Sequence, residues 1–281
     1  MATLLNPRTI RELAASIDLH PTKQRGQNFV VDPNTVRRIV GLSGVTANDT
    51  VLEIGPGLGS LTLGLLETGA RVTAIEIEPA LAELLPATVA RHQPDHAGNL
   101  QVVLNDALAV TELPGAAPTA VVANLPYNVS VPVLLHLLEH FDSWTNGLVM
   151  VQLEVADRLV AAPGSKVYGV PSAKLAWYAG ATRVGTVPPT VFWPMPNVDS
   201  GLVRITRREL PVTSASRKQV FAVIDAAFAQ RRKMLRSALR GLCGSAGAAA
   251  GVLQAAGIES TLRGEVLDVT AFARIAEATA V

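Results

Sequence analysis

The amino-acid sequence predicts an α/β fold, a mostly parallel sheet flanked by helices, with a small all-helical domain after it. In the first part of the chain, short β-rich runs alternate with segments of helical periodicity, which is typical of parallel strands joined by crossover helices. From about residue 214 only the helical pattern continues. Because a proline and a Thr/Ser cluster interrupt the pattern near 208–214, we expect domains at 1–210 and 211–281.

The composition allows a large buried core. Of 281 residues, 49% are apolar, 17% are charged and only 4% are aromatic, so Ala, Val and Leu must supply most of the core. The single cysteine, Cys243, excludes an internal disulfide framework and a Cys-rich zinc site. No apolar run reaches the roughly 18 residues of a membrane span, and the N-terminal residues lack a targeting pattern, so we expect a cytoplasmic protein without membrane attachment.

The elements of the first domain are predicted in chain order. Apolar and β-branched runs predict strands at 51–54, 71–77, 101–104, 119–123, 147–153 and 199–206. Apolar residues at helical spacing predict helices at 61–68, 79–89, 130–140 and 154–161. Pro79 stands in a favoured first-turn position, and we expect Ser130 to cap the helix that it begins.

The second domain is expected to contain a long basic amphipathic helix at 216–240 and shorter helices at 247–257 and 270–279. Residues 41–130 contain nine acids and two bases, whereas residues 204–240 contain ten bases and two acids. This asymmetry indicates either a surface for an anionic partner, nucleic acid being the first candidate, or a solvated charged helix. On the first interpretation, phosphate contacts would come from Arg231, Arg232, Lys233 and Arg236.

A glycine-rich turn, Gly55-Pro56-Gly57-Leu58-Gly59, follows the first predicted strand and opens a helix. Glycines let the backbone approach a ligand closely, and the start of a helix offers free N–H groups. The dinucleotide pattern G-x-G-x-x-G fails, because Ser60 stands at the position of the third glycine, and no Lys-Ser or Lys-Thr pair makes a phosphate-binding loop. The turn therefore favours a nucleoside ligand without a pyrophosphate.

Two acids follow the next two strands. Glu76 lies at the end of strand 71–77, where a carboxylate can accept both hydroxyls of a ribose. Asp106 follows strand 101–104 and could accept an adenine amino group. Alternatively, Glu76 is an exposed strand end and Asp106 is a helix cap. A glycine turn and two acids in this order favour the nucleoside site.

The tetrapeptide Asn124-Leu125-Pro126-Tyr127 follows another strand, at the edge where α/β sheets bind ligands. An exocyclic adenine nitrogen is a poor nucleophile because its lone pair is delocalised into the ring. The Asn124 side-chain oxygen and a carbonyl of Leu125 or Pro126 could accept its N–H bonds, while Tyr127 stacks on the base. No general base is needed, so catalysis would be mainly positioning. The alternative is an ordinary turn containing Asn and Pro.

Other candidates carry less information. His136 and His140 have the helical spacing of a zinc pair, but no third ligand is evident, so we expect no metal site. Phe192 lies in a proline-rich loop and could either flank a flipped base or anchor the loop by burial.

With these motifs, the chain resembles the class I S-adenosylmethionine-dependent methyltransferases, which have a Rossmann-like fold. More narrowly, it resembles the ribosomal RNA adenine dimethyltransferases of the bacterial small-subunit (16S) type, from about Lys23 to the C-terminus. The segments that carry this resemblance are 23–29, similar to the family's cofactor lid, and 52–62, 151–172, 188–203 and 228–239.

The resemblance implies roles for particular residues. S-adenosylmethionine would be bound by Asn28, Val30, Gly55, Gly57, Glu76, Asp106 and Asn124. The target adenine would be held by Asn124, Leu125, Pro126 and Tyr127, with Phe192 nearby. Val30, Asn105, Leu153 and Asn197 depart from the usual family residues, and the last three concern contacts with RNA rather than the chemistry.

The implied reaction is dimethylation of N6 in two adjacent adenines near the 3′ end of 16S rRNA, within the small (30S) subunit. No metal is implied, and we expect a monomer with a possible second role in small-subunit maturation. Two alternatives stay open, a 23S rRNA dimethyltransferase of the macrolide-resistance type and a non-catalytic ribosome assembly factor.

Overall fold

The structure is a computed structural model that describes residues 3–20 and 28–279. It divides into two compact units. The first comprises the described residues up to Ala156 together with Thr182–Arg207, and the second comprises Asp157–Ala181 with the described residues from Arg208 onward. The sequence expectation assigned residues 157–181 to the first domain. The structure groups them with the C-terminal helices, because α7 (Val170–Tyr178) packs against α8 (Arg217–Ala229) and α12 (Val269–Thr279).

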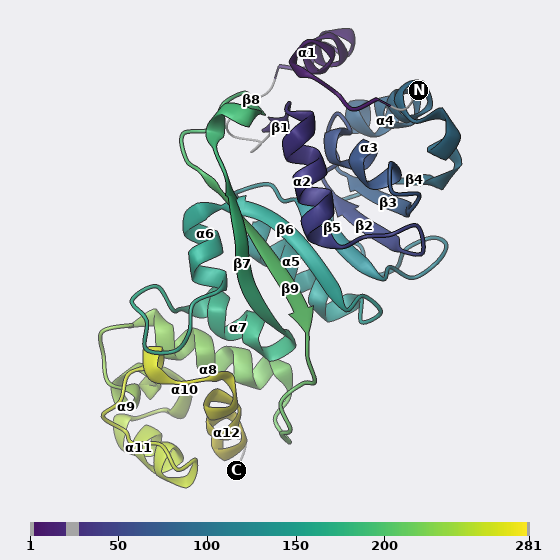
Figure 1. The fold of residues 1–281 in the computed structure, drawn as a ribbon. Helices are drawn as coiled ribbons and strands as arrows, with labels where there is room; N and C mark the ends of the chain where they lie inside the picture. The colour runs from purple at the N-terminus through teal and green to yellow at the C-terminus, as the bar shows by residue number, and fades with distance from the viewer. Residues whose placement is uncertain (1–2, 21–27, 280–281) are drawn as a thin grey trace. The chain divides into compact units, whose positions relative to one another are not determined.

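A seven-stranded sheet in the order β4-β3-β2-β5-β6-β9-β7 runs through the first unit (Figure 1). Its strands are β2 (Thr50–Ile54), β3 (Arg71–Glu76), β4 (Leu100–Leu104), β5 (Ala120–Asn124), β6 (Asn146–Gln152), β7 (Ala179–Val187) and β9 (Ser200–Arg207). The pairs β3–β4, β2–β3, β2–β5 and β5–β6 are parallel, whereas β9 runs antiparallel to β6. All six predicted strands are confirmed.

The sequence did not predict β7 or a small separate sheet. Strand β7 lies at the edge of the large sheet, most of its residues are at least partly exposed, and two glycines interrupt it, so it lacks a clear alternation of apolar residues. The small sheet pairs β1 (Phe29–Val30) antiparallel with β8 (Phe192–Trp193). Two residues per strand are too few for any periodicity to be read from the sequence.

The order of the strands creates a switch point between β2 and β5. The chain starts the large sheet at β2, moves outward through β3 to β4, and then returns to the other side of β2 with β5 and β6. In open α/β sheets, ligands bind at the carboxyl ends of the strands beside such a point. Gly55 follows β2 and Asn124 ends β5, so both predicted motifs meet there.

Helices and 3-10 turns complete the first unit. They are α1 (Pro7–Ser16), α2 (Pro33–Ser43), α3 (Ser60–Leu66), α4 (Pro79–His92), η2 (Pro94–Asn99), α5 (Ser130–His140), the first part of α6 (Leu153–Leu159) and η3 (Pro189–Val191). The four helices predicted for this region are confirmed as α3, α4, α5 and α6. The expected cap of α5 is wrong, because Val129 is the capping residue and Ser130 already lies inside the first turn.

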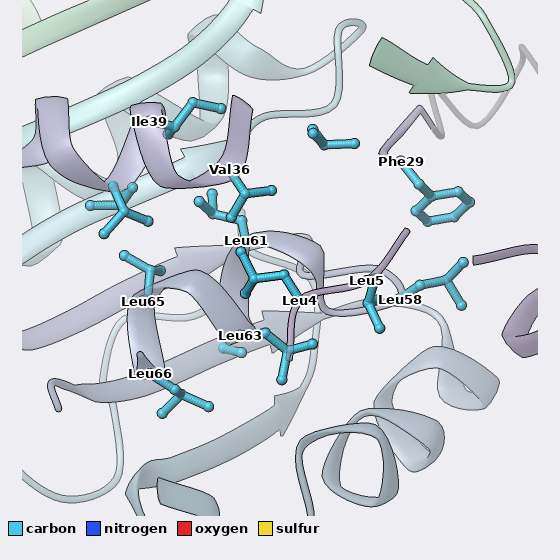
Figure 2. Close-up of a cluster of buried hydrophobic side chains, with 14 of the residues drawn as sticks. Leu4, Leu5, Phe29, Val36, Ile39, Leu58, Leu61, Leu63, Leu65 and Leu66 are labelled. Atoms are coloured by element: carbon cyan, nitrogen blue, oxygen red, sulfur yellow. The ribbon is translucent and has the colours of Figure 1, made fainter. Parts of the chain in front are cut away.

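The core near the switch point is formed by α2, α3 and the N-terminal segment. Figure 2 shows Val36 and Ile39 of α2 close to Leu61 and Leu65 of α3. Every residue of α3 is buried, and helix α2 also contacts β6. The close approach of the two helices needs a small residue, since a Cβ at Gly64 would lie 2.5 Å from Cγ1 of Val36. The helix that follows the glycine turn is therefore held in a tightly packed core.

The second unit is helical, as expected, but the prediction of one long basic helix at 216–240 is wrong. The helices here are α7, α8, α9 (Leu235–Ala238), α10 (Arg240–Cys243), α11 (Ala246–Ala255), the 3-10 turn η4 (Gly264–Val266) and α12. Helix α8 begins at a capping box between Ser216 and Gln219 and ends at Ala229. The other two predicted helices are confirmed as α11 and α12.

Helix α8 ends at Ala229, and the backbone donors at the start of α9 bind a different segment. The N–H of Leu235 donates to the carbonyl of Leu262 at 2.7 Å, and the N–H of Arg236 donates to the carbonyl of Ser260 at 3.2 Å. Tertiary hydrogen bonds thus replace the bonds that a continuous helix would make. In the described part of the chain, no helix is long and apolar enough to cross a lipid bilayer.

Candidate functional site

A cavity of about 400 Å³ lies at the carboxyl edge of the sheet in the first unit, beside the switch point. It is lined by predicted site residues, namely Asn28, Val30, Gly55, Gly57, Glu76, Asp106, Asn124 and Pro126. These residues come from the ends of different strands, and the parallel pairing brings them to one edge. The sequence-predicted cofactor residues therefore surround one space.

The glycine turn passes close to its neighbours in conformations that other residues rarely adopt. The φ angles of Gly55 and Gly57 are +64° and +56°. A Cβ on Gly57 would lie 2.6 Å from Cε1 of Phe29, so a side chain does not fit there. Ser60, which breaks the dinucleotide pattern, donates its hydroxyl to the carbonyl of Val30 at 2.6 Å. The serine thus ties β1 to the start of α3.

Glu76 is 4% exposed and is held by three backbone donors. Its Oε2 accepts from the N–H of Gly57 at 3.1 Å, and its Oε1 accepts from the N–H groups of Ile77 and Glu78 at 2.9 and 3.0 Å. Burial raises the pKa of Glu76, and the three donors oppose that rise. A carboxylate has about four acceptor sites, so Glu76 can still accept a ribose hydroxyl. It is not an exposed strand end.

Asp106 also lines the cavity and is exposed. Its Oδ1 accepts from the N–H of Leu108 at 2.9 Å, which shapes the turn after β4. The local capping role and the cavity position are therefore both present in one side chain. The second carboxylate oxygen can accept from an amino group in the cavity.

Sequence reasoning missed Glu53, which also lines the cavity. Its side chain is 1% exposed and accepts from Oγ1 of Thr62 at 2.7 Å. Burial raises the pKa of Glu53 to about 8, and the nearby Glu76 carboxylate adds to the rise. The available signal was a carboxylate inside the otherwise apolar run Val51–Ile54, since a buried strand seldom contains an acid without a local reason.

Asn124 is fixed by the backbone of Asn28. Its Nδ2 donates to the Asn28 carbonyl at 3.0 Å. A carbonyl oxygen only accepts, so this bond determines which end of the amide carries the nitrogen. The Asn124 Oδ1 is then the end of the amide left to accept a hydrogen bond from a ligand.

The other three residues of the tetrapeptide lie in different surroundings. Leu125 is buried and its N–H donates to the carbonyl of Met150 at 3.0 Å, which continues the pairing of β5 with β6. Pro126 lines the cavity next to Gly55. Tyr127 is outside the cavity lining, and its hydroxyl shares a 2.7 Å hydrogen bond with Oγ of the fully buried Ser200. Burial raises the pKa of Tyr127.

Phe192 does not reach the cavity. It is 4% exposed and belongs to the hydrophobic core, opposite Val30 in the small sheet. Its neighbour Trp193 stacks on Phe29 with 6.3 Å between ring centroids. The structure thus shows the loop-anchoring role that the sequence left as an alternative. The similar lid segment falls mainly on residues 23–27, which lie outside the described residues.

The four basic residues predicted to contact phosphates lie in the second unit and are not equivalent. Arg232, Lys233 and Arg236 are exposed. Arg231 is half-buried and bonded to Glu265 and to the carbonyl of Lys166. The break after α8 places Arg231, Arg232 and Lys233 in a turn and Arg236 in α9, rather than along one helix face.

The described residues contain no group of three or more His, Cys, Asp or Glu side chains that could hold a metal ion. The ring centroids of His136 and His140 lie 4.2 Å apart, and Nε2 of His136 is hydrogen-bonded to the carbonyl of Val110 at 2.8 Å. The cavity does fit a nucleoside. It is lined by a glycine turn with positive φ angles, by a buried carboxylate suited to ribose hydroxyls and by an exposed carboxylate suited to an amino group.

Comparisons with known proteins agree with this geometry. Residues 20–278 match the family model described as "Ribosomal RNA adenine dimethylase". "Ribosomal RNA small subunit methyltransferase A" of Cutibacterium acnes is 67% identical, over 99% of this chain and 95% of that protein. Such a match over nearly the full length extends to both units.

Solved structures are similar in fold. A dimethyladenosine transferase from Plasmodium falciparum has a TM-score of 0.71 and 23% identity, covering 87% of this chain and 94% of that one. The 23S rRNA methyltransferase ErmE has a TM-score of 0.62 and 24% identity, covering 90% of this chain and 100% of that one. The methyltransferase fold expected from the sequence is therefore present, and the chain belongs to the ribosomal RNA adenine dimethylase family.

Proposed function

We propose that this chain transfers methyl groups from S-adenosylmethionine to N6 of two adjacent adenines near the 3′ end of 16S rRNA, in the small ribosomal subunit. The observation that carries the proposal is the Asn124 amide, oriented by the Asn28 carbonyl at the edge of a nucleoside-sized cavity. The 67% identical relative is named as a small-subunit methyltransferase, which supports the choice of RNA. We further propose that the chain acts as a monomer in the cytoplasm.

The cofactor would be held by residues from four strand ends. The Glu76 carboxylate accepts the ribose hydroxyls, and Asp106 accepts the adenine amino group. The glycine turn and Asn28 line the space for the rest of the molecule, with Val30 as an apolar wall. S-adenosylmethionine supplies a methyl group bound to a positively charged sulfur, which is electrophilic without any metal.

The target adenine would be activated by positioning. The Asn124 Oδ1 accepts one N–H of the amino group, which favours a nitrogen whose lone pair points out of the ring plane and toward the methyl group. Tyr127 offers a flat surface for stacking on the base. The proton leaves to water after transfer, so no side chain needs a pKa near neutrality. The alignment of nucleophile and methyl group supplies most of the rate enhancement.

The two alternatives have less support. A 23S rRNA target would be the one named for ErmE, but this chain is only 24% identical in sequence to ErmE. It is 67% identical to the small-subunit relative. A non-catalytic assembly factor needs no oriented amide and no cofactor cavity, and both are built here. A second role in small-subunit maturation is compatible with methylation and is part of the proposal.

The test is methyl transfer from labelled S-adenosylmethionine to unmethylated small subunits, with large-subunit RNA in a parallel reaction, followed by mapping of the label. We expect label on two adjacent adenines near the 3′ end of 16S rRNA and none on the large-subunit RNA. Label on 23S rRNA would transfer the assignment to the resistance type. No label on either RNA, with cofactor still bound, would leave an assembly factor.

A further inference from the structure

Arg231 differs from the basic residues around it in what its side chain contacts. Its Nε donates to Oε2 of Glu265 at 3.1 Å, and its Nη2 donates to the carbonyl of Lys166 at 2.7 Å. A weaker contact of 3.5 Å joins Nη2 to the carbonyl of Ser165. These donors point into the second unit, so the planar guanidinium is committed to protein acceptors and only 36% of the side chain is exposed.

The acceptors belong to two segments that are distant in the sequence. Lys166 lies in the stretch between α6 and α7, which the structure leaves without regular secondary structure from residue 160 to 169. Glu265 lies in η4, just before α12. The Gly164 N–H donates to the Glu265 carbonyl at 2.7 Å, which is a second link between these segments. Arg231 therefore joins three segments at one point.

The loop also has an independent anchor. Tyr168 is 1% exposed, and its hydroxyl donates to the carbonyl of Leu267 at 2.8 Å. The ring lies edge-on to Phe228 with centroids 5.9 Å apart. Tyr168 thus fixes the end of the loop at α7, whereas Arg231 fixes its middle, where Lys166 is exposed. Loss of the Arg231 contacts would leave the Tyr168 anchor in place.

We infer that Arg231 is a positioning residue of an RNA-binding surface, defined by the exposed side chains of Lys166, Arg232 and Lys233. Its guanidinium holds the loop that carries Lys166 against the turn that carries Arg232 and Lys233, so that three cations face a phosphate backbone as a preformed set. Arg231 itself contacts no phosphate. This inference rests on the proposed function for the identity of the anion, which is ribosomal RNA.

Preformed cations bind better because their side chains and loop are already ordered before the RNA arrives. Ordering a long side chain on binding costs about 0.5–1.5 kcal/mol, which corresponds to roughly three- to tenfold in affinity. The number of phosphates neutralised sets the salt dependence of binding, and it stays the same when a positioning residue is lost. A positioning residue and a contact residue therefore have different signatures.

The experiment compares two variants that separate the effect of charge from the effect of loop anchoring. Arg231→Lys keeps the positive charge but cannot reproduce the forked contacts. Glu265→Ala removes a negative charge beside the surface, so simple attraction to RNA would increase, whereas the anchoring of Arg231 is lost. The controls are Arg232→Ala, for a direct contact, and Glu259→Ala, for removal of an exposed acid in the same unit.

Binding to unmethylated small subunits is measured over a series of salt concentrations. We expect Arg231→Lys and Glu265→Ala each to weaken binding roughly three- to tenfold with an unchanged salt slope. KM for subunits should rise while kcat at saturation stays at the wild-type value. Arg232→Ala should lower the salt slope by about one, and Glu259→Ala should leave binding equal or slightly tighter.

Hydrogen exchange of the free protein gives the second readout. Amides of residues 164–167 should exchange faster in Arg231→Lys and Glu265→Ala, and at the wild-type rate in both controls. Wild-type binding by Arg231→Lys, tighter binding by Glu265→Ala and unchanged exchange would together overturn the inference and make Arg231 a phosphate contact. A wild-type protein that fails to bind small subunits would count against the proposed function instead, and the exchange data would still decide how Arg231 acts.

Discussion

The side-chain Nδ2 of Asn124 lies 3.0 Å from the backbone carbonyl oxygen of Asn28, 96 residues away in the sequence. The bond joins the end of β5 to the residue just before β1. It fixes the amide so that Oδ1 is left to accept a hydrogen bond from a ligand, which in the proposed function is the amino group of the target base. A single tertiary contact thus sets the polarity of the proposed catalytic side chain.

Asn124→Asp tests this polarity with almost no change in shape. A carboxylate cannot donate to the Asn28 carbonyl and is repelled by it, so the side chain should lose its orientation. We expect methyl transfer to small subunits to fall by about 100-fold or more, because misplacement on the scale of 1 Å can cost that much. Single-turnover rates at saturating cofactor would measure it. Equal loss of subunit binding would instead make Asn124 a structural residue.

Gly57→Ala tests whether the glycine turn contributes to cofactor binding. The new Cβ would meet Phe29 at 2.6 Å at a φ of +56°, so the turn must shift. Strain of this kind costs about 1–3 kcal/mol, and we expect cofactor affinity to fall roughly tenfold, as measured by calorimetry. The matched control is Gly98→Ala, where no atom lies within 4 Å of the new Cβ and affinity should be unchanged. Wild-type affinity in Gly57→Ala would show that the turn is not in contact with the cofactor.

Glu53→Gln tests the buried acid through the pH dependence of stability. Burial raises the pKa of Glu53 from 4.5 to about 8 in the folded protein. Between these values the unfolded chain releases a proton that the folded protein keeps, so this group makes the wild type less stable as pH rises. The neutral amide removes that loss. We expect the Tm of Glu53→Gln relative to wild type to be higher at pH 8.5 than at pH 5.

The control for this comparison is Glu83→Gln, which neutralises an exposed carboxylate on α4. Its Tm should follow the wild-type Tm at both pH values. A difference between Glu53→Gln and wild type that is the same at pH 5 and pH 8.5 would mean that Glu53 is ionised in the folded protein across this range.

Two substitutions of Tyr127 test whether its ring stacks on the target base. Tyr127→Phe removes the hydroxyl that bonds to Ser200 but keeps the ring, so we expect kcat/KM for small subunits to stay within about fivefold of wild type. Tyr127→Ala removes the ring, and base stacking of this kind contributes about 1–3 kcal/mol, so kcat/KM should fall by roughly 10- to 100-fold. Similar losses in both variants would mean that the Ser200 bond, rather than the ring, is what matters.

Much of the fold and of the cavity could be predicted because the carboxyl ends of parallel strands lie at one edge of the sheet. Gly55, Asp106 and Asn124 each follow a predicted strand and Glu76 lies at the end of one, and parallel pairing brings the ends of such strands to one edge. The order of the motifs along the chain was therefore enough to predict that they share a site. Their detailed contacts, such as the three backbone donors on Glu76, depend on the turn geometry and were not readable.

The predictions that were wrong failed where tertiary contacts override local pattern. The apolar spacing of 216–240 suits one helix, but the backbone N–H groups of Leu235 and Arg236 donate to the carbonyls of Leu262 and Ser260 instead of continuing it. The same break turns Arg231 inward and separates it from its exposed neighbours. The sequence left two roles open for Phe192, next to a flipped base or as a buried anchor of its loop. Only its packing in the folded core shows that it is buried.

The methylation state of the product tests the proposed function. Small subunits lacking these methyl groups are incubated with wild-type protein and saturating S-adenosylmethionine, and the nucleosides of the 16S 3′ end are identified by mass spectrometry. We expect N6,N6-dimethyladenosine at two adjacent positions, and no methylated adenosine there when Asn124→Ala replaces the wild type. Monomethyladenosine alone at saturating cofactor, or full dimethylation by Asn124→Ala, would contradict the proposed function.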